Sequence, residues 1–310
     1  MMPLPPLVRP LLTPLRATAG VLLAATLLAG CGGSTAGNAP TPAPARAPGD
    51  SAAPAPSTPG HGPAVTYKPV RNAAYRLERH DSLSLQYPGG ATQEQARDRI
   101  AFLRVTLIES PTPGAYQVAI VLDSLQAFEN GQPGSPDSVA AARGTRWTAT
   151  LSTTGGLSAL TPDRTGTLPD ELTGRLRLLF PALPAGGVRE GMEWTDTTEY
   201  HLTADAFPGS ERAVTTYHAA ASDAPGMRKG ITLRSDGSYD RKGTRNQGDQ
   251  ELQMQATGTR QGVHVLGLDG VLISARGTEA GDMTITVPTV GQTVPVKQSG
   301  SYAITSIGSR

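Results

Sequence analysis

The sequence predicts a mainly β protein: a curved antiparallel sheet, either a half-barrel or a sandwich, with one or two short helices after a disordered tether. Apolar and polar residues alternate with period two through most of the chain beyond residue 66, as in strands with one solvated face. Short glycine-containing turns are expected between the strands of the second half. Because these turns are short, neighbouring strands are expected to pair in antiparallel fashion.

A signal peptide is expected over residues 1–30. Arg9 and Arg16 give it a positive start, and residues 17–28 form an apolar core of signal-peptide length. This core is too short for a membrane-spanning helix, which needs about 20 apolar residues. An uncleaved anchor and an ordinary secretory leader are the alternatives.

The leader ends in Leu28-Ala29-Gly30-Cys31, which contains the only cysteine of the chain. This stretch resembles the lipobox of bacterial lipoproteins, in which signal peptidase II recognises the three residues before the cysteine and cuts there. The resemblance implies that Cys31 carries a lipid that anchors the chain to the cell envelope. Gly32 follows in place of the aspartate associated with inner-membrane retention, which implies the outer membrane, facing the periplasm or the surface, in a cell with two membranes.

Residues 31–65 are expected to form a disordered tether after the lipidated cysteine. They are rich in proline and alanine and contain almost no large apolar residue, so they cannot build a core. Alternating alanine and proline favours extended, polyproline-like chain. The tether is either a spacer that holds the domain off the membrane or a passive linker, and His61 within it is expected to be inert.

The β-rich exported domain is expected over residues 66–310, which is long enough for one sizeable core. Tyr75, Leu77 and Arg79 illustrate the spacing of two that marks its strands. In the first half, strands are expected around 75–87, 102–108, 116–123, 147–151 and 157–160. In the second half, they are expected at 194–202, 213–221, 231–239, 251–257, 263–276, 282–287 and 294–304. Turns are expected between strands at Asp236-Gly237, Gly258, Asp269-Gly270, Gly281 and Gly291.

One helix is expected from Leu168 to about Phe180, before Pro181 ends it. Pro169 suits an early helical position, and the two acids that follow it lie in the first turn, where the helix dipole favours negative charge. Large apolar residues recur on one side of this helix at helical spacing: Leu172, Leu176, Leu179 and Phe180. Residues 92–99 are expected to form either a weaker helix or a polar loop.

The segment 178–194, LLFPALPAGGVREGMEW, is similar to FP-x-LP … V-x-x-G-x-x-W stretches in a loose group of β-rich bacterial lipoproteins. The strand pattern behind a lipid anchor also resembles the half-barrels of lipoprotein-localisation factors and of mycobacterial lipid-binding lipoproteins. Those proteins cradle acyl chains in an apolar concavity. On physical grounds, one expectation is that the 168–180 helix lies across the mouth of a curved sheet, as a plug or lid. The alternative is a core helix that covers a sheet edge.

Composition narrows the classes of function. With Cys31 modified, the chain keeps no thiol, which excludes disulfides, thiol catalysis and cysteine–zinc sites. A net charge of +1 gives no basic field for nucleic acid. The partners expected are therefore the membrane, through the lipid, and either an apolar ligand or an envelope protein.

No catalytic residue, cofactor or metal site is predicted, and the chain is not expected to be an enzyme. His80-Asp81-Ser82 brings together the residue types of a triad, but consecutive strand residues point to opposite faces. His201, His218 and His264 lie on three expected strands and would have to converge to hold zinc.

Three hypotheses of function remain. The first is a non-enzymatic, membrane-anchored module that binds an apolar or lipid-like ligand in the curved sheet. The second is a structural or protein-interaction module of the envelope without a small ligand, and the third is a hydrolase with an unrecognised site. The surroundings of Leu176, Leu179 and Phe180 discriminate between the first two: a cavity favours the ligand, and a packed core favours the interaction module.

Overall fold

The computed structural model describes residues 56–87, 89–158, 160–202, 207–222, 229–248 and 250–309. Its main element is a 12-stranded antiparallel sheet with the order β7-β6-β4-β3-β2-β14-β13-β12-β11-β10-β9, and β5 pairs only with β4. The strands are β2 (Val70–Gln86), β3 (Thr92–Glu109), β4 (Ala115–Glu129), β5 (Gln132–Pro133), β6 (Arg146–Ser152), β7 (Thr161–Pro162), β9 (Glu193–Leu202), β10 (Gly209–Ser222), β11 (Gly230–Gln247), β12 (Gln250–Gly267), β13 (Leu272–Val287) and β14 (Gln292–Ser309).

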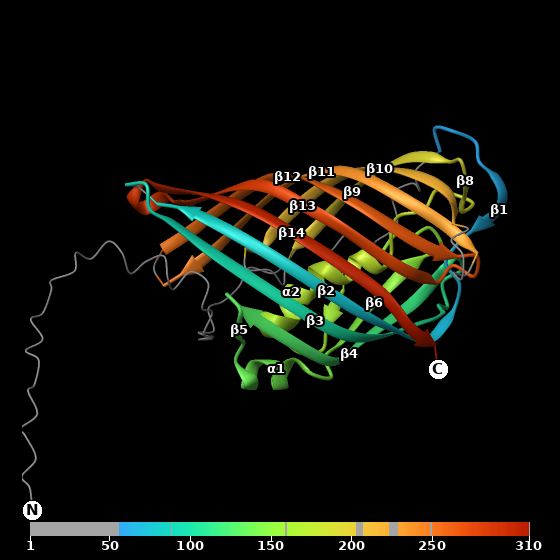
Figure 1. Cartoon of the computed structure of the whole chain (residues 1–310), viewed down its shortest axis with the longest axis horizontal. Helices are drawn as coiled ribbons and strands as arrows, with labels where there is room; N and C mark the ends of the chain where they lie inside the picture. Colours follow the sequence, from blue (N-terminus) through green and yellow to red (C-terminus); the bar gives the residue numbers. More distant parts are fainter. Residues whose placement is uncertain are drawn as a thin grey trace, which may run out of the picture. The chain divides into compact units, whose positions relative to one another are not determined.

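The sheet curls into a half-barrel (Figure 1). This confirms the mainly β, curved antiparallel fold. Of the two architectures that the alternating pattern allowed, the sheet forms the half-barrel and not the sandwich. From β2 to β4 and from β9 to β14, strands that follow one another pair as neighbours, and β4 pairs with β6. Strand β14 pairs with β2 and so joins the two ends of the domain in the middle of the sheet. A second, two-stranded sheet pairs β1 (His61–Val65) with β8 (Val188–Glu190). Strand β1 lies upstream of residue 66, where the domain was expected to begin.

Helical structure is limited to four short segments of the described chain: α1 (Pro136–Ala142), α2 (Thr167–Arg175), the 3-10 helix η1 (Leu176–Leu179) and the 3-10 helix η2 (Pro288–Val290). Helix α2 and η1 together confirm the helix expected from Leu168, which tightens after Arg175 into a 3-10 turn. Helix α1 was not predicted, although Ser135 caps it and Pro136 begins it. The weaker helix and the polar loop that were the alternatives for 92–99 are both wrong, because these residues form the first half of β3.

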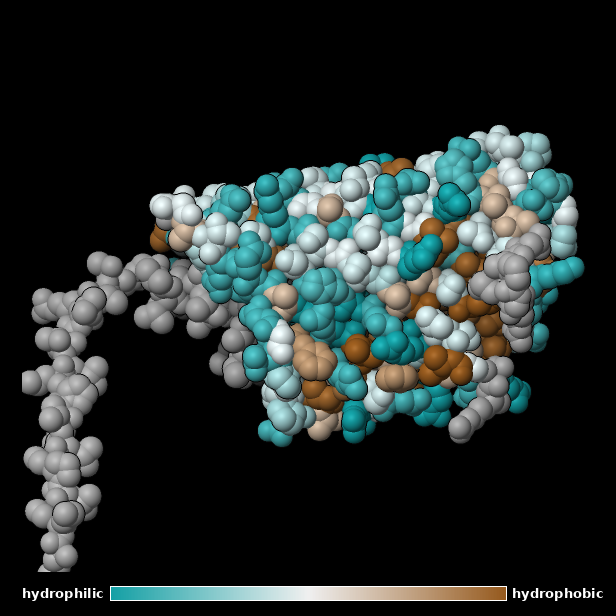
Figure 2. Space-filling model, viewed as in Figure 1, coloured by the Kyte–Doolittle hydropathy of each residue, from teal (hydrophilic) through white to brown (hydrophobic). Residues whose placement is uncertain are grey.

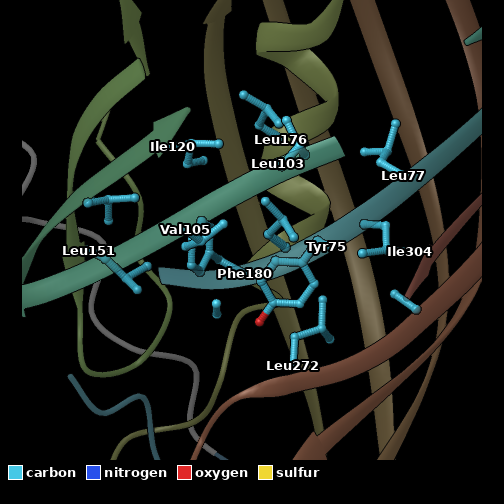
Figure 3. Close-up of a cluster of buried hydrophobic side chains, with 14 of the residues drawn as sticks. Tyr75, Leu77, Leu103, Val105, Ile120, Leu151, Leu176, Phe180, Leu272 and Ile304 are labelled. Carbon is cyan, nitrogen blue, oxygen red and sulfur yellow. The ribbon is translucent and has the colours of Figure 1, made fainter. Parts of the chain in front are cut away.

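Helix α2 and η1 pass along the concave side of the sheet (Figure 1). The largest apolar cluster fills the space between them and the sheet. Figure 3 shows Leu176 and Phe180 among side chains from β2, β3 and β4, with Tyr75, Leu103 and Ile120 close by. Each of these residues is buried. The alternating positions of the strands therefore supply one wall of the core, and the helix supplies the other.

Glycines in the middle of strands let the sheet pack closely on itself. A Cβ atom on Gly258 would lie 2.5 Å from the carbonyl oxygen of Ala280 and 2.6 Å from the hydroxyl of Tyr239. A Cβ on Gly281 would also lie 2.6 Å from that hydroxyl, so the Tyr239 side chain lies across both glycines. The turns expected at Gly258, Gly281 and Asp236-Gly237 are thus wrong, because glycine here makes room within continuous strands.

Two of the expected turns are confirmed. Gly270 and Gly291 both have positive φ angles, of 77° and 62°, and each lies between consecutive strands. Glycine adopts this left-handed conformation without steric cost. The short strand expected at 157–160 is only an isolated bridge from Leu157 to Leu151.

Beyond the helix, the curled sheet packs against itself. Leu85, Ile285 and Val296 belong to one buried apolar cluster of the inner face, and Tyr239 and Met254 belong to another. Partly buried Phe207 and Met283 pack against both clusters. The concave side is therefore apolar at both ends: the helix covers one end, and the two clusters occupy the other.

The convex side is largely polar. Figure 2 shows hydrophilic and neutral residues over the faces of β12, β13 and β14, and brown, hydrophobic residues gathered toward the C-terminal end of β14. Ile108 and Ile307 are exposed by 43% and 52%, and they belong to β3 and β14 near that end. Scattered exposed residues of this kind are normal on a protein surface.

Candidate functional site

The four apolar residues expected at a ligand mouth lie in a packed core. Leu172, Leu176, Leu179 and Phe180 are exposed by only 3%, 0%, 2% and 8%. The ring of Phe180 meets Tyr67 edge-on at 6.0 Å between centroids, and the Tyr67 hydroxyl donates to the carbonyl of Pro181 at 2.7 Å. The structure therefore brings these four residues together, as predicted, but against side chains and not around a cavity wide enough for an acyl chain.

A small cavity lies beside this core among the described residues. Its volume is about 20 Å³, which is room for about one water molecule. The residues that line it are Tyr67, Val70, Tyr75, Val105, Leu107, Leu179, Phe180, Gly270, Val271 and Leu272.

The polar side of α2 and η1 is fixed to the sheet by charges. Glu171 accepts hydrogen bonds from Arg97 at 3.2 Å and from the Nη2 of Arg99 at 3.0 Å, both on β3. Thr173 accepts a hydrogen bond of 2.8 Å from the indole of Trp147 on β6. The helix is thereby held in one position on the concave side.

The centre of this charged region is Glu279 on β13. Its carboxylate binds Arg79, Arg260 at 3.3 Å and Arg175 of α2 at 3.4 Å. Burial alone would raise the pKa of Glu279, but the three guanidinium groups outweigh burial and hold this pKa well below its usual range. Glu211 on β10 binds Arg260 through both carboxylate oxygens, at 2.5 and 3.1 Å.

Arginine side chains also pack on tyrosines across the inner face. Arg260 lies 4.2 Å above the ring of Tyr239, and Arg177 of η1 lies 4.1 Å above the ring of Tyr200. Burial lowers the pKa of Arg177, and its contacts with Tyr200 and nearby Glu211 oppose this effect. We call the residues of this region the charged belt: Arg79, Asp81, Arg175, Arg177, Glu211, Arg260 and Glu279.

His264 is the buried histidine of the inner face. Its ring hydrogen-bonds the backbone of Leu178 in η1, whereas its Nδ1 atom has no partner among the described residues. Burial lowers its pKa to about 4, although the hydrogen bond to Leu178 acts in the opposite direction. At neutral pH the ring is therefore uncharged and links β12 to η1.

The three histidines considered for zinc do not converge. His264 is buried on the concave side, whereas His218 and His201 are exposed. His218 pairs with Glu193 at 3.1 Å. Within the described chain, no group of three or more potential metal ligands is assembled. The His80-Asp81-Ser82 run is also split, because His80 binds Asp98 at 2.6 Å and Asp81 binds Arg79.

The charged belt and the buried Arg99 were missed at the sequence level, although their signal was present. Arg79 follows Tyr75 and Leu77 at the spacing of two that marks the inner face, and Arg99 stands in the same relation to Leu103. An arginine that continues a run of inward-facing apolar residues at a spacing of two predicted a buried charge with an acidic partner.

The lipobox residues Leu28, Ala29, Gly30 and Cys31 lie outside the described residues. Among the described helices, none has the length and apolar character that crossing a membrane would require.

No protein-family model matches the chain. No curated protein matches it either. Among solved structures, the chain is similar to one described as "Asymmetric conductivity of engineered proteins", at 12% identity and a TM-score of 0.21. It is similar to two mutants of the Rh. blastica porin, at 11% and 10% identity and a TM-score of 0.22 each. All three alignments cover 74% of this chain and 98% of the other chain. Values at this level assign no family to the chain.

Proposed function

We propose that this chain is a lipid-anchored, non-enzymatic module of the cell envelope that acts by contacting another protein and binds no small apolar ligand. The observation that carries the proposal is the packed core between the helix and the sheet. Leu176 is fully buried in the apolar cluster that the helix shares with the sheet. An acyl chain would have to displace this helix from its core and its ion pairs.

The charged belt supports the same proposal. A carrier of apolar ligands needs an open apolar concavity, but here guanidinium and carboxylate groups cross the middle of the inner face. Glu279 alone engages three arginines. Buried charges that are paired in this way hold elements in register, and they bind a second group only if the existing pairs break.

The paired carboxylates also support a non-enzymatic role. General acid–base catalysis needs a group whose pKa lies near the working pH. The pKa of Glu279 is instead shifted far below that range, because the arginines stabilise its charged form. The neutral ring of His264 faces the core and the η1 backbone, where a substrate has no access.

The proposal is tested by native mass spectrometry of the chain from residue 31, carrying Cys31→Ser so that no lipid is attached. We expect the bare protein mass after incubation with vesicles of phosphatidylethanolamine and phosphatidylglycerol. Organic extraction should release no stoichiometric lipid. A one-to-one lipid adduct that resists gentle activation would refute the proposal in favour of an apolar-ligand carrier.

The anchor is tested separately in cells. The unmodified chain should incorporate labelled palmitate and sediment with membranes, and Cys31→Ala should abolish both properties. Photo-crosslinking in the same cells should give a discrete protein adduct for the anchored chain. Palmitate labelling that persists in the Cys31→Ala variant would remove Cys31 as the anchor.

A further inference from the structure

We propose that the free edge of β9 (Glu193–Leu202) binds an extended, basic segment of a partner protein as an added strand. This inference rests on the proposed function, because it names the surface and the class of partner through which the module acts. The mode of binding is β-augmentation, in which main-chain hydrogen bonds supply affinity and alternate side chains supply selectivity.

The two edges of the half-barrel differ in their protection. At one edge, β5 and β7 are only two residues long, and each ends in proline. The chain that follows β6 also covers that strand: Ser152 donates to Gly156, Ser158 donates to Thr150, and Asp163 donates to Arg146. Short strands and prolines are common devices against unwanted strand pairing.

Strand β9 has none of these devices. It pairs with β10 over ten consecutive residues without a bulge. Its sequence, EWTDTTEYHL, contains no proline and no lysine. Among the described residues, only the start of β9 is covered on the other side, where Ser57 donates to the Glu193 carbonyl at 2.8 Å and Thr58 forms a bridge. The remainder is a long, regular edge of the kind that pairs with another chain.

The register identifies the backbone groups that face outward. Backbone groups of successive residues in an antiparallel strand point alternately to its two sides. The Met192 carbonyl accepts from Ala219 on the β10 side, and the Glu193 carbonyl accepts from Ser57 on the other side. Odd-numbered residues of β9 therefore present their N–H and C=O groups to the free edge: Thr195, Thr197, Glu199 and His201.

Charge favours a basic partner over a second copy of this chain. Strand β9 carries Glu193, Asp196 and Glu199 and has no lysine or arginine. On β10, Arg212 and His218 lie opposite Glu199 and Glu193 in the register and balance this charge only in part. Pairing of β9 with β9 of another copy would bring two acidic strands together, which is unfavourable. Glu193 and Glu199 lie on one face of the sheet and Asp196 lies on the other. Lysine or arginine at alternate positions of an incoming strand would therefore meet Glu193 and Glu199.

The test uses the chain from residue 31 with Cys31→Ser and a fluorescent ten-residue peptide of alternating lysine and threonine. Fluorescence polarisation should show saturable binding. The same peptide with N-methyl groups on alternate amides should not bind, because it cannot complete the ladder. A peptide of alternating glutamate and threonine should bind at least about tenfold more weakly.

The matched variants are Thr197→Pro and Thr197→Ala. Proline removes an N–H that faces the free edge but breaks no hydrogen bond to β10. The fold should therefore persist while the affinity for the peptide falls about tenfold. Alanine keeps the backbone and should leave affinity within about twofold. Circular dichroism confirms that both variants are folded, and the N-methylated peptide tests the same point without altering the protein.

Unchanged binding to Thr197→Pro, or equal binding of the N-methylated peptide, would overturn the assignment of the site to this edge. Equal binding of the acidic peptide would overturn the basic partner. Failure of every peptide would overturn the inference while leaving the proposed function standing, because that function is judged by the bare protein mass and by the adduct formed in cells.

Discussion

Acidification should destabilise this protein through His264 before it affects the carboxylates. The folded-state pKa of this histidine is about 4, against 6.5 for an exposed histidine. Because the folded pKa is depressed, the unfolded chain binds the proton more readily. The stabilisation is therefore complete above pH 6.5 and is lost as the pH falls toward 4.

The magnitude follows from the size of the shift. A difference of about 2.5 pKa units corresponds to about 3.4 kcal/mol when the loss is complete, below pH 4. At pH 5 the loss from this one group is about 2 kcal/mol relative to pH 7. His264 is only 5% exposed, so solvent screening reduces this free-energy difference only slightly.

The assay is urea unfolding followed by circular dichroism at pH 7 and pH 5, for the unmodified chain and for His264→Leu. The variant should be less stable at pH 7, because it loses the contact with Leu178, but it should lose about 2 kcal/mol less on acidification. His201→Gln, at an exposed histidine, serves as the matched control and should keep the full pH dependence. Equal losses in the unmodified chain and in His264→Leu would refute the reasoning.

Three further predictions concern the core, the charged belt and the glycines. Leu176→Ala should reduce the free energy of unfolding by about 2–5 kcal/mol, as measured by urea unfolding, because it opens a cavity in the packed core; a loss below about 1 kcal/mol would mean that the residue faces free space. Glu279→Gln should lower the free energy of unfolding by about 3–5 kcal/mol, because it leaves buried arginines without their shared partner. Equal stability of this variant and the unmodified chain in urea unfolding at pH 7 would contradict this prediction. Gly258→Ala should lower the free energy of unfolding by about 1–3 kcal/mol through overpacking, whereas Gly174→Ala, where an added Cβ meets nothing within 4 Å, should raise it by about 0.5–1 kcal/mol; equal free energies of unfolding for the two variants would contradict the close approach at Gly258.

Local signals in the sequence were sufficient for much of this fold. The period of two at Tyr75 and Leu77 depends only on which residues face the core, so it predicted strand β2. The apolar spacing of Leu172, Leu176 and Leu179 predicted the helix in the same way. Both patterns arise within a single element and require no knowledge of its neighbours.

The errors arose where distant parts of the chain decide the structure. Gly258 and Gly281 have the composition of turns, but the side chain of Tyr239 from a neighbouring strand occupies the space above them. Residues 92–99 are charged enough to suggest a helix or a polar loop. Arg97 and Arg99 nevertheless face inward on β3, because Glu171 on the helix compensates their charge.

The candidate site was predictable only in part. The sequence predicted the 168–180 helix itself, but it could not decide between a lid at the mouth of the sheet and a core helix. That choice depends on how far the sheet curls, and the curl depends on pairings such as β2 with β14 between opposite ends of the domain. The unpaired edge of β9 likewise becomes visible only once the strand order is known.

The pairing of β2 with β14 also has a consequence for biogenesis. Strand β14 is synthesised after every other strand of the sheet, yet it occupies the middle, between β2 and β13. Until β14 is synthesised, the domain consists of two half-sheets with open inner edges. Folding must then wait for contacts between residues that are almost the whole domain apart in the sequence, and such long-range contacts make folding slow. During that interval the chain is vulnerable to aggregation. A holdase chaperone that shields exposed strands should therefore raise the yield of this protein.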